Sequence, residues 1–362
     1  MTRIQLTGTA IDHEGCRMLG PLDLTIASGE RLVLLGPSGS GKTTLLRTLA
    51  GLHPVADGTV AFDGRDVTRT PPAERDIAFI NQEASLQPHL DVRRNLGFAL
   101  RLRRVPRAQV RQRVAVESRA FSLGSLLPRR PRELSGGERH EVALARSLVR
   151  RASVLLMDEP FARIDPARRD RLMRELVRMQ EGYGVTLVVA TNDQRVAMTV
   201  ADRVAVLTDG AVAQIGSPVT LYEEPTSLFV AGFLGAPPMN LLDGTIQRRD
   251  GRAYLDAGPF RIPTWAPELT SRAGAPIVLG ARPHRIEIEP APTRASRSCR
   301  VLSSAFTGPD VVLHLHAPTG QRITAVVEPP GPEVASLVGV AIDPRRVHVF
   351  DPVDERVIAH GA

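Results

Sequence analysis

One stretch of eight residues constrains this chain more than any other, because it contains the only lysine among 46 basic side chains. Lys42 is the seventh residue of Gly36-Pro37-Ser38-Gly39-Ser40-Gly41-Lys42-Thr43, called the Lys42 loop below. This glycine spacing is typical of loops whose backbone N–H groups and lysine surround phosphate oxygens. An ammonium is a compact charge on a flexible stem, whereas a guanidinium is a rigid planar fork. The retained lysine therefore indicates a phosphate-binding loop.

The residues on either side of the Lys42 loop predict the elements that hold it. Residues 31–35 have the pattern of a buried strand that enters the loop, and residues 44–51, beginning at Thr44, have the pattern of a helix that leaves it. Phosphates would then meet a helix N-terminus, where unpaired N–H groups and the helix dipole favour anions. We therefore expect an α/β nucleotide-binding core.

A second apolar strand is predicted to end in two carboxylates. Residues 154–157 are apolar and are followed directly by Asp158 and Glu159. Asp158, together with Thr43, can hold Mg²⁺, because this cation prefers oxygen ligands and keeps several waters. Glu159 can act as the general base toward an attacking water. Acids at a strand end are weak evidence alone, but beside the Lys42 loop they become strong evidence.

A third motif lies between these two. Residues 134–138, Leu-Ser-Gly-Gly-Glu, precede a helical pattern, and a serine with two glycines at a helix start makes a second anion-binding surface. With these motifs the chain resembles the ATP-binding-cassette ATPases, whose signature loop matches residues 134–138. The resemblance implies a head-to-tail homodimer in which this loop closes over ATP held by the partner's Lys42 loop. The implied contact residues are Ser135, Gly136, Gly137 and Glu138.

The same resemblance assigns the other site residues. Gln82 matches the glutamine that touches Mg²⁺ and senses the membrane subunits, and Asp165 matches the D-loop aspartate beside the nucleotide. The implied nucleotide contacts around the first loop are Gly36, Pro37, Ser38, Gly39, Ser40, Gly41, Lys42, Thr43 and Thr44. The implied metal ligands are Thr43, Gln82 and Asp158, and the implied catalytic residues are Glu159, Asn192 and Gln82.

Within the cassettes, the match narrows to importers of carbohydrates and glycerol phosphate. Three segments carry it, residues 87–96, 193–203 and 235–240. The resemblance implies an ATPase that powers a bacterial importer for a sugar or a glycerol-phosphate compound. It also implies two membrane-spanning permease subunits and an extracytoplasmic solute-binding protein as partners, and a place at the cytoplasmic face of the cell membrane.

Two positions are the main departures from the family pattern, beside lesser changes at Ala162, Arg163 and Glu138. Asn192 stands where the family has a histidine that contacts the γ-phosphate and the attacking water. An asparagine amide donates a hydrogen bond but carries neither charge nor proton, so losing a transition-state contact here would slow hydrolysis ~10²–10⁴-fold. Asn192 either preserves the essential contact or makes the chain a hydrolysis-impaired regulatory subunit. His13 falls near the family's adenine-stacking aromatic, and is either that platform or an ordinary loop residue.

The charge of the chain is unevenly distributed. Residues 93–151 contain 16 arginines and four glutamates, a balance of +12 in a chain with a formal net charge of +7. Only two aromatic residues lie in this segment, so it offers few stacking surfaces for bases, and we expect no nucleic-acid partner. We expect it to face anionic headgroups of the inner membrane. The alternatives are a solvated helical face and a soluble, nucleic-acid-associated cassette protein.

Two domains are predicted along the chain. Residues 1–235 alternate strands with helices, which predicts a mostly parallel sheet covered on both faces, and residues 89–151 form a helical insertion in it. Residues 236–362 contain short alternating runs bounded by proline and glycine, which predict a small all-β barrel. The resemblance makes it a regulatory barrel of the oligonucleotide/oligosaccharide type. No apolar run approaches the roughly 18 residues of a membrane helix.

Overall fold

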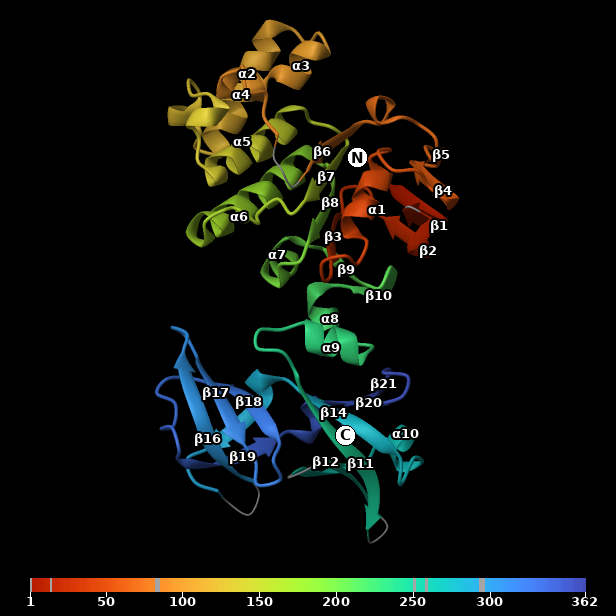
Figure 1. Ribbon diagram of the computed structural model, residues 1–362, viewed down its shortest axis with the longest axis vertical. Coiled ribbons are helices and arrows are strands. Elements are labelled where there is room, and N and C mark those ends of the chain that lie inside the picture. The colour runs from red at the N-terminus through yellow and green to blue at the C-terminus, as the bar shows by residue number, and fades with distance from the viewer. Residues whose placement is uncertain (1, 14, 82–84, 250–251, 258–259, 293–296) are drawn as a thin grey trace. The chain divides into compact units, whose positions relative to one another are not determined.

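The chain folds into two compact units, Met1–Pro218 and Val219–Ala362, which are drawn in Figure 1. This computed structural model describes residues 2–13, 15–81, 85–249, 252–257, 260–292 and 297–362. Each unit has its own hydrophobic core. The second unit contains residues 219–235 in addition to the segment from residue 236 onward that the sequence predicts to be a separate domain.

A six-stranded sheet forms the centre of the first unit and is parallel except for the edge strand β10 (Ala211–Gly216). Beyond β10, its strands in spatial order are β9 (Arg203–Thr208), β3 (Arg31–Leu35), β8 (Thr186–Thr191), β7 (Val154–Asp158) and β6 (Ile77–Ile80). Three helices follow strands of this sheet: α1 (Lys42–Leu49) follows β3, α6 (Pro166–Tyr183) follows β7, and α7 (Gln194–Val200) follows β8. Strands β7 and β8 are buried along their whole length, as expected for a sheet covered on both faces.

The N-terminal strands form a separate sheet, which the sequence did not predict. This four-stranded sheet has the order β2 (Cys16–Ile26), β1 (Ile4–His13), β4 (Asp57–Phe62) and β5 (Arg65–Asp66). Only two residues separate β1 from β2 along the chain, and such a short connection permits only antiparallel pairing. Residues of β1, β2 and α1 share one core cluster with β3, so the second sheet covers the helix that follows the Lys42 loop.

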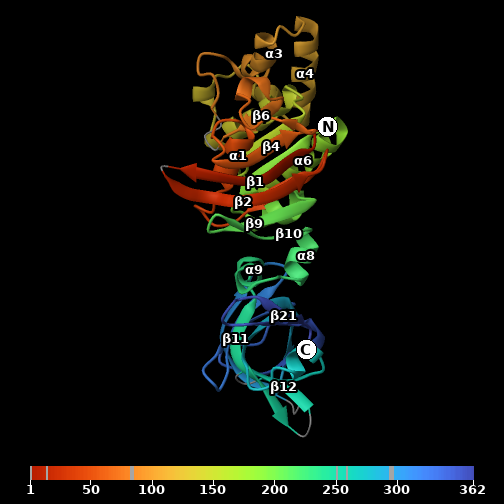
Figure 2. The same ribbon diagram turned by 90° about the vertical axis from the view of Figure 1, so that its right-hand side faces the viewer.

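The helical insertion lies between β6 and β7. Its helices are α2 (Val92–Leu96), α3 (Phe98–Leu102), α4 (Arg107–Ala120) and α5 (Gly136–Val149). Short 3₁₀ turns also lie in the first unit: η1 (Pro72–Glu74), η2 (Gly124–Leu126) and η3 (Pro131–Glu133). Helix α5 contacts α2, α4 and β6 and so joins the insertion to the sheet. In Figures 1 and 2, α3 and α4 lie on the side of the insertion away from the sheet.

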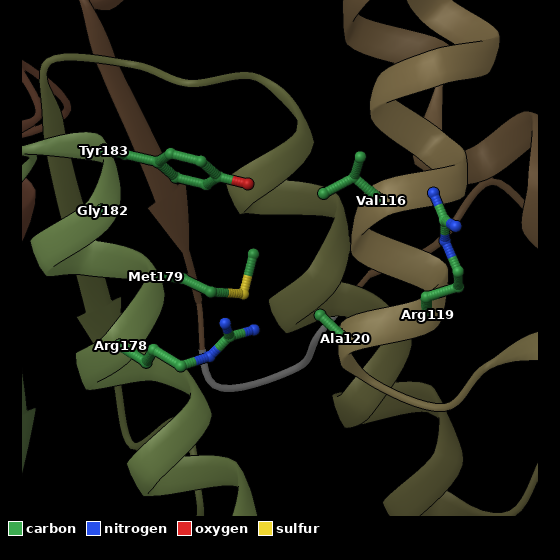
Figure 3. A pocket seen from close by; sticks show the side chains of 7 residues that line it. All are labelled: Val116, Arg119, Ala120, Arg178, Met179, Gly182 and Tyr183. Atoms are coloured by element: carbon green, nitrogen blue, oxygen red, sulfur yellow. The ribbon is translucent and has the colours of Figure 1, made fainter.

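A cavity of about 480 Å³ opens where α4 of the insertion meets α6 of the core (Figure 3). Its lining residues are Val116, Arg119, Ala120, Arg178, Met179, Gly182 and Tyr183. The Tyr183 hydroxyl donates to the buried Glu117 carboxylate at 2.6 Å, and the Arg151 guanidinium lies 4.7 Å from the centre of the tyrosine ring. Burial raises the pKa of Glu117. These contacts join the insertion to the core and lie among residues outside the predicted nucleotide site.

The second unit is built mainly from two antiparallel sheets. The first has the order β13 (Phe260–Thr264), β12 (Arg252–Ala257), β11 (Asn240–Arg249), β14 (Pro276–Ala281), β20 (Val347–Phe350) and β21 (Val357–His360). The second has the order β15 (Ile286–Glu289), β19 (Leu337–Ile342), β16 (Arg297–Phe306), β17 (Val311–His316) and β18 (Arg322–Val327). Short helices complete the unit: α8 (Pro218–Glu223), α9 (Leu228–Phe233), α10 (Pro267–Thr270), η4 (Pro283–Arg285) and η5 (Pro344–Arg346).

The two sheets of the second unit enclose one apolar interior. Buried side chains from both sheets belong to a single core cluster, and Figure 2 shows the strands curling around it. The alternating runs seen in the sequence correspond to β15 and β17. The predicted all-β barrel is therefore confirmed.

Candidate functional site

The site is assembled where three neighbouring parallel strands end. Leu35 of β3 is in register with Thr191 of β8, and Ala190 of β8 is in register with Asp158 of β7. Because parallel strands have their carboxyl ends at one edge of the sheet, the segments that follow them converge there. The structure thereby brings together the Lys42 loop, the carboxylates after β7 and the segment beginning at Asn192.

The path of the Lys42 loop depends on two glycines. A Cβ at Gly36 would lie 2.2 Å from the carbonyl oxygen of Leu207, so a side chain does not fit there. Gly41 has a φ of 97° in the left-handed region and directly precedes α1. The loop therefore ends at the first turn of α1, whose free N–H groups can receive an anion.

Lys42 is buried beneath this loop and bonded to it. Its Nζ donates to the carbonyl oxygens of Gly36 at 2.8 Å and Pro37 at 2.7 Å, and it is only 7% exposed. Burial lowers the pKa of Lys42, and the nearby carboxylates of Glu159 and Asp158 oppose that effect. The two carboxylates thus help to keep the ammonium charged inside the protein.

Thr43 and Asp158 form a pair of oxygen donors beside the loop. The Thr43 hydroxyl donates to Oδ1 of Asp158 at 3.0 Å. Burial raises the pKa of Asp158, and the hydrogen bond from Thr43 is the largest effect opposing it. A hydroxyl and a carboxylate suit Mg²⁺, which keeps waters and substrate phosphates as its other ligands. Gln82, the third predicted ligand, lies outside the described residues.

Glu159 is held by two hydrogen bonds at the end of β8. Its Oε2 accepts from the Thr191 hydroxyl at 3.0 Å and its Oε1 from the backbone N–H of Asn192 at 2.8 Å. Burial raises the pKa of Glu159, and these two hydrogen bonds oppose the rise. The backbone of Glu159 has a φ of 47°, an uncommon value for a residue with a side chain. The carboxylate is therefore fixed in position and more basic than an ordinary surface glutamate.

Thr191 is a site residue that the sequence did not reveal. Its hydroxyl oxygen accepts from the N–H of Asp193 at 3.0 Å, so its single proton is available for Glu159. The side chain is 2% exposed. Its place at the end of a strand beside the Lys42 loop was the only available signal, because the contact itself depends on how β7 and β8 are aligned.

Asn192 meets Glu159 through its backbone. The donor is the main-chain N–H, so this hydrogen bond does not depend on whether the side chain is asparagine or histidine. The residue itself is exposed. The departure from the family pattern therefore leaves the support of Glu159 intact and changes only what the exposed side chain can offer to a nucleotide.

The second anion motif lies at the start of α5. The Ser135 hydroxyl accepts from the N–H of Glu138 at 3.2 Å, while Oε2 of Glu138 accepts from the N–H of Ser135 at 2.7 Å. This is a reciprocal capping box. The backbone hydrogen bond from Ser135 lowers the pKa of Glu138. A Cβ at Gly136 would have open space around it, and a Cβ at Gly137 would meet only the Arg163 carbonyl oxygen, at 3.5 Å.

Two other predicted contacts occupy separate places. Oδ1 of Asp165 accepts from the N–H of Ala167 at 2.9 Å and caps the N-terminus of α6. His13 ends β1, and its ring centroid lies 5.7 Å from that of His53. Within the part of the chain that is described, no hydrogen bond joins either residue to the Lys42 loop. Their roles toward a nucleotide stay predictions.

Family models identify the class of protein that this geometry belongs to. The ABC transporter family matches residues 19–162, the MalK OB fold domain matches residues 235–286, and the TOBE domain matches residues 279–350. The chain belongs to the ABC transporter family, as an ATP-binding-cassette ATPase whose hydrolysis is coupled to transport. The resemblance stated from the sequence is confirmed.

Among named relatives, the chain is similar to the sn-glycerol-3-phosphate import ATP-binding protein UgpC. It is 40% identical to UgpC of Burkholderia ambifaria over 357 residues, which cover 97% of this chain and 98% of the relative. It is 39% identical to UgpC of Burkholderia lata over 359 residues, with the same shares covered.

The solved structures resemble part of the chain. A dimeric structure of the bacterial ABC transporter cassette MJ0796 has a TM-score of 0.55 and 27% identity, covering 59% of this chain and 98% of its own. The cassette cbiO1 of Clostridium perfringens has a TM-score of 0.57 and 26% identity, covering 61% and 90%. Within the described residues, no helix is both long and apolar enough to span a membrane.

Proposed function

We propose that this chain is the ATPase subunit of an importer for sn-glycerol 3-phosphate. The observation that carries the enzymatic role is the convergence of buried Lys42, the Thr43–Asp158 pair and Glu159 at one sheet edge. The substrate rests on the relatives, which are named as sn-glycerol-3-phosphate import proteins and match the chain over 97% of its length. Within the importer, the permease subunits and the solute-binding protein would select the substrate.

Each side chain has a distinct role in this proposal. Lys42 exchanges its bonds to the loop carbonyls for bonds to the β- and γ-phosphates of ATP. Thr43, Asp158 and Gln82 would hold Mg²⁺, which would neutralise charge at the phosphates. Glu159, oriented by Thr191 and the N–H of Asn192, orients and deprotonates the attacking water.

The second anion motif completes the site in a dimer. Ser135, Gly136, Gly137 and Glu138 of one chain would close over ATP held by the Lys42 loop of the other. Support comes from the exposed position of Ser135 and Gly136 and from the dimeric structure of the similar cassette MJ0796. The remaining partners would be two permease subunits, which would hold the ATPase at the cytoplasmic face of the membrane, and an extracytoplasmic solute-binding protein.

A second candidate function is a regulatory cassette that binds ATP without effective hydrolysis. It is favoured by one observation, the exposed asparagine at position 192 in place of the family's histidine. We place it second because Glu159 and both of its hydrogen-bond donors are present.

The test is hydrolysis by the importer reconstituted in proteoliposomes with its permease and solute-binding subunits. We expect ATP hydrolysis that is stimulated by sn-glycerol 3-phosphate, not by maltose, and that is lost in Glu159→Gln. Stimulation by maltose and not by sn-glycerol 3-phosphate would contradict the proposed substrate but not the ATPase activity. Hydrolysis by the parent no higher than that of Glu159→Gln would contradict the ATPase role and would favour the second candidate, a regulatory cassette.

A further inference from the structure

The turn between α3 and α4 combines an exposed leucine with a run of arginines. Leu102, the last residue of α3, is 69% exposed. Residues 92–116 around it contain eight arginines and no aspartate or glutamate. Figures 1 and 2 show this turn on the outer side of the helical insertion, away from the central sheet. A large apolar side chain is thus presented inside a strongly cationic surface.

The turn itself is ordered by backbone hydrogen bonds. The N–H of Arg104 donates to the carbonyl oxygen of Arg101 at 3.0 Å, and that of Val105 donates to the carbonyl oxygen of Leu100 at 3.0 Å. Arg104 also adopts a φ of 56°, in the left-handed region. Leu102 is therefore held outward by a defined turn rather than by a frayed helix end.

The charge around Leu102 is only partly neutralised. Arg94 lies 3.7 Å from Asp91 and Arg103 lies 3.6 Å from Asp76, so two of the arginines are paired. Three exposed guanidinium groups, those of Arg104, Arg107 and Arg111, have no carboxylate within 4.0 Å among the residues described. We call Leu102, Arg104, Arg107 and Arg111 together the α3–α4 tip.

The chemistry of the α3–α4 tip indicates its partner. Guanidinium groups bind phosphate oxygens in a bidentate manner, and a leucine among cations suits the boundary between headgroups and acyl chains. Bases need stacking surfaces, but residues 99–116 contain no aromatic side chain. A merely solvated arginine run would not explain why Leu102 is held outward at its centre.

We propose that the α3–α4 tip docks on the anionic headgroups of the inner leaflet, with Leu102 entering the interface. The proposal rests on the proposed function, which places the protein at the cytoplasmic face of the membrane. The tip gives the subunit a direct contact with the bilayer, in addition to its contact with the permease. Its effect is to raise the local concentration of the ATPase at the membrane.

The test is cosedimentation of the full chain with vesicles of phosphatidylglycerol and phosphatidylcholine. Replacing both Arg104 and Arg107 by glutamine should weaken vesicle binding about 25-fold. Each arginine near the surface contributes ~1 kcal/mol to binding, and losing it weakens binding about fivefold. Leu102→Ser should weaken it several-fold. The control for the arginine variant is a double replacement of two exposed arginines elsewhere, Arg300→Gln with Arg322→Gln. The control for Leu102→Ser is Leu52→Ser, at another exposed leucine. Vesicle binding by both controls should stay within about twofold of the parent.

Three results would overturn the proposal. The first is an absence of vesicle binding at ~0.05 M salt, where screening is weak. The second is equal weakening by the tip variants and their matched controls, which would indicate net charge alone. The third is tighter binding to duplex DNA or RNA than to vesicles at ~0.15 M salt. Circular dichroism and ATP affinity, measured for every variant, report folding and the nucleotide site separately. Failure of the proposed function would appear instead as absent hydrolysis in the reconstituted importer.

Discussion

The two helix starts predicted to bind phosphate, those of α1 and α5, differ in how complete they are. At α1 the lysine Lys42 is buried, bonded to its own loop and flanked by Asp158 and Glu159. At α5, Ser135 and Gly136 are exposed, and the serine hydroxyl accepts a hydrogen bond from its own helix, from the N–H of Glu138. The comparison teaches that the lysine, the hydroxyl and the carboxylates at the start of α1 are already joined by contacts within one chain. The donors at the start of α5 face solvent and, in the proposed dimer, would meet a nucleotide held by the partner chain.

The largest expected effect separates catalysis from binding at the α1 side. Glu159→Gln should lower steady-state hydrolysis by the reconstituted importer ~10²–10⁴-fold, because the amide cannot take a proton from water. ATP affinity should stay within about twofold, because the Lys42 loop is complete without the carboxylate. Retained hydrolysis would place the base elsewhere. A loss of ATP affinity in Glu159→Gln would mean that the Lys42 loop needs the Glu159 carboxylate in order to bind ATP.

The second prediction compares the two helix starts directly. Lys42→Arg should weaken ATP binding by the isolated chain at least ~30-fold, about 2 kcal/mol, because a planar fork does not fit the buried space of the ammonium. Ser135→Ala should leave that affinity unchanged. Both affinities can be measured by titration with a fluorescent nucleotide. An affinity for Lys42→Arg within about threefold of the parent would contradict the argument, as would a matching loss in Ser135→Ala.

The third prediction concerns the donor to Glu159. Thr191→Val removes one of the two hydrogen bonds that fix the Glu159 carboxylate, and the lost orientation of the base should slow hydrolysis about tenfold, a barrier ~1.4 kcal/mol higher. Because that bond favours the ionised form, its loss raises the pKa of Glu159 further, so the acidic limb of the pH–rate profile should move to higher pH. Thr191→Ser keeps the hydroxyl and should restore the profile. A slower enzyme with an unshifted profile would indicate a structural role only.

Asn192→His should have a smaller effect of opposite sign. The backbone donor to Glu159 is kept, and the imidazole adds a side chain able to carry a charge, so hydrolysis should rise several-fold. The measurement is steady-state hydrolysis beside the parent and Glu159→Gln. A parent rate equal to that of Glu159→Gln would identify a nucleotide-binding switch, in which case the ATPase assignment is withdrawn.

The smallest effect is expected for Glu138→Gln at the α5 side. Glutamine also closes a capping box, so the free energy of unfolding should change by less than ~0.5 kcal/mol, whereas Ser135→Ala should cost about 1 kcal/mol. Chemical denaturation of the two variants checks this. A cost for Glu138→Gln larger than that for Ser135→Ala would show that the carboxylate, rather than the hydroxyl, secures the helix start.

How much of this could be read from the sequence differs between parts of the site. The Lys42 loop and the acids after β7 are contiguous motifs whose spacing reflects their chemistry, and the alternating runs of the barrel reflect local burial. The hydrogen bond from Thr191 to Glu159 joins the last residue of β8 to the residue that follows β7. It therefore depends on the register of β7 with β8. The Ser135–Glu138 spacing is that of a capping box and could have predicted the turned-back carboxylate.

The helix cap at Ser135 also affects what its own hydroxyl proton can do. Its oxygen accepts from the N–H of Glu138, which engages a lone pair and leaves the O–H bond uncommitted. The same interaction that stabilises the helix start therefore leaves the hydroxyl proton available for another acceptor. In the proposed dimer, the serine could donate to a phosphate of the partner's ATP while keeping this cap, so binding at this loop would require no local unfolding.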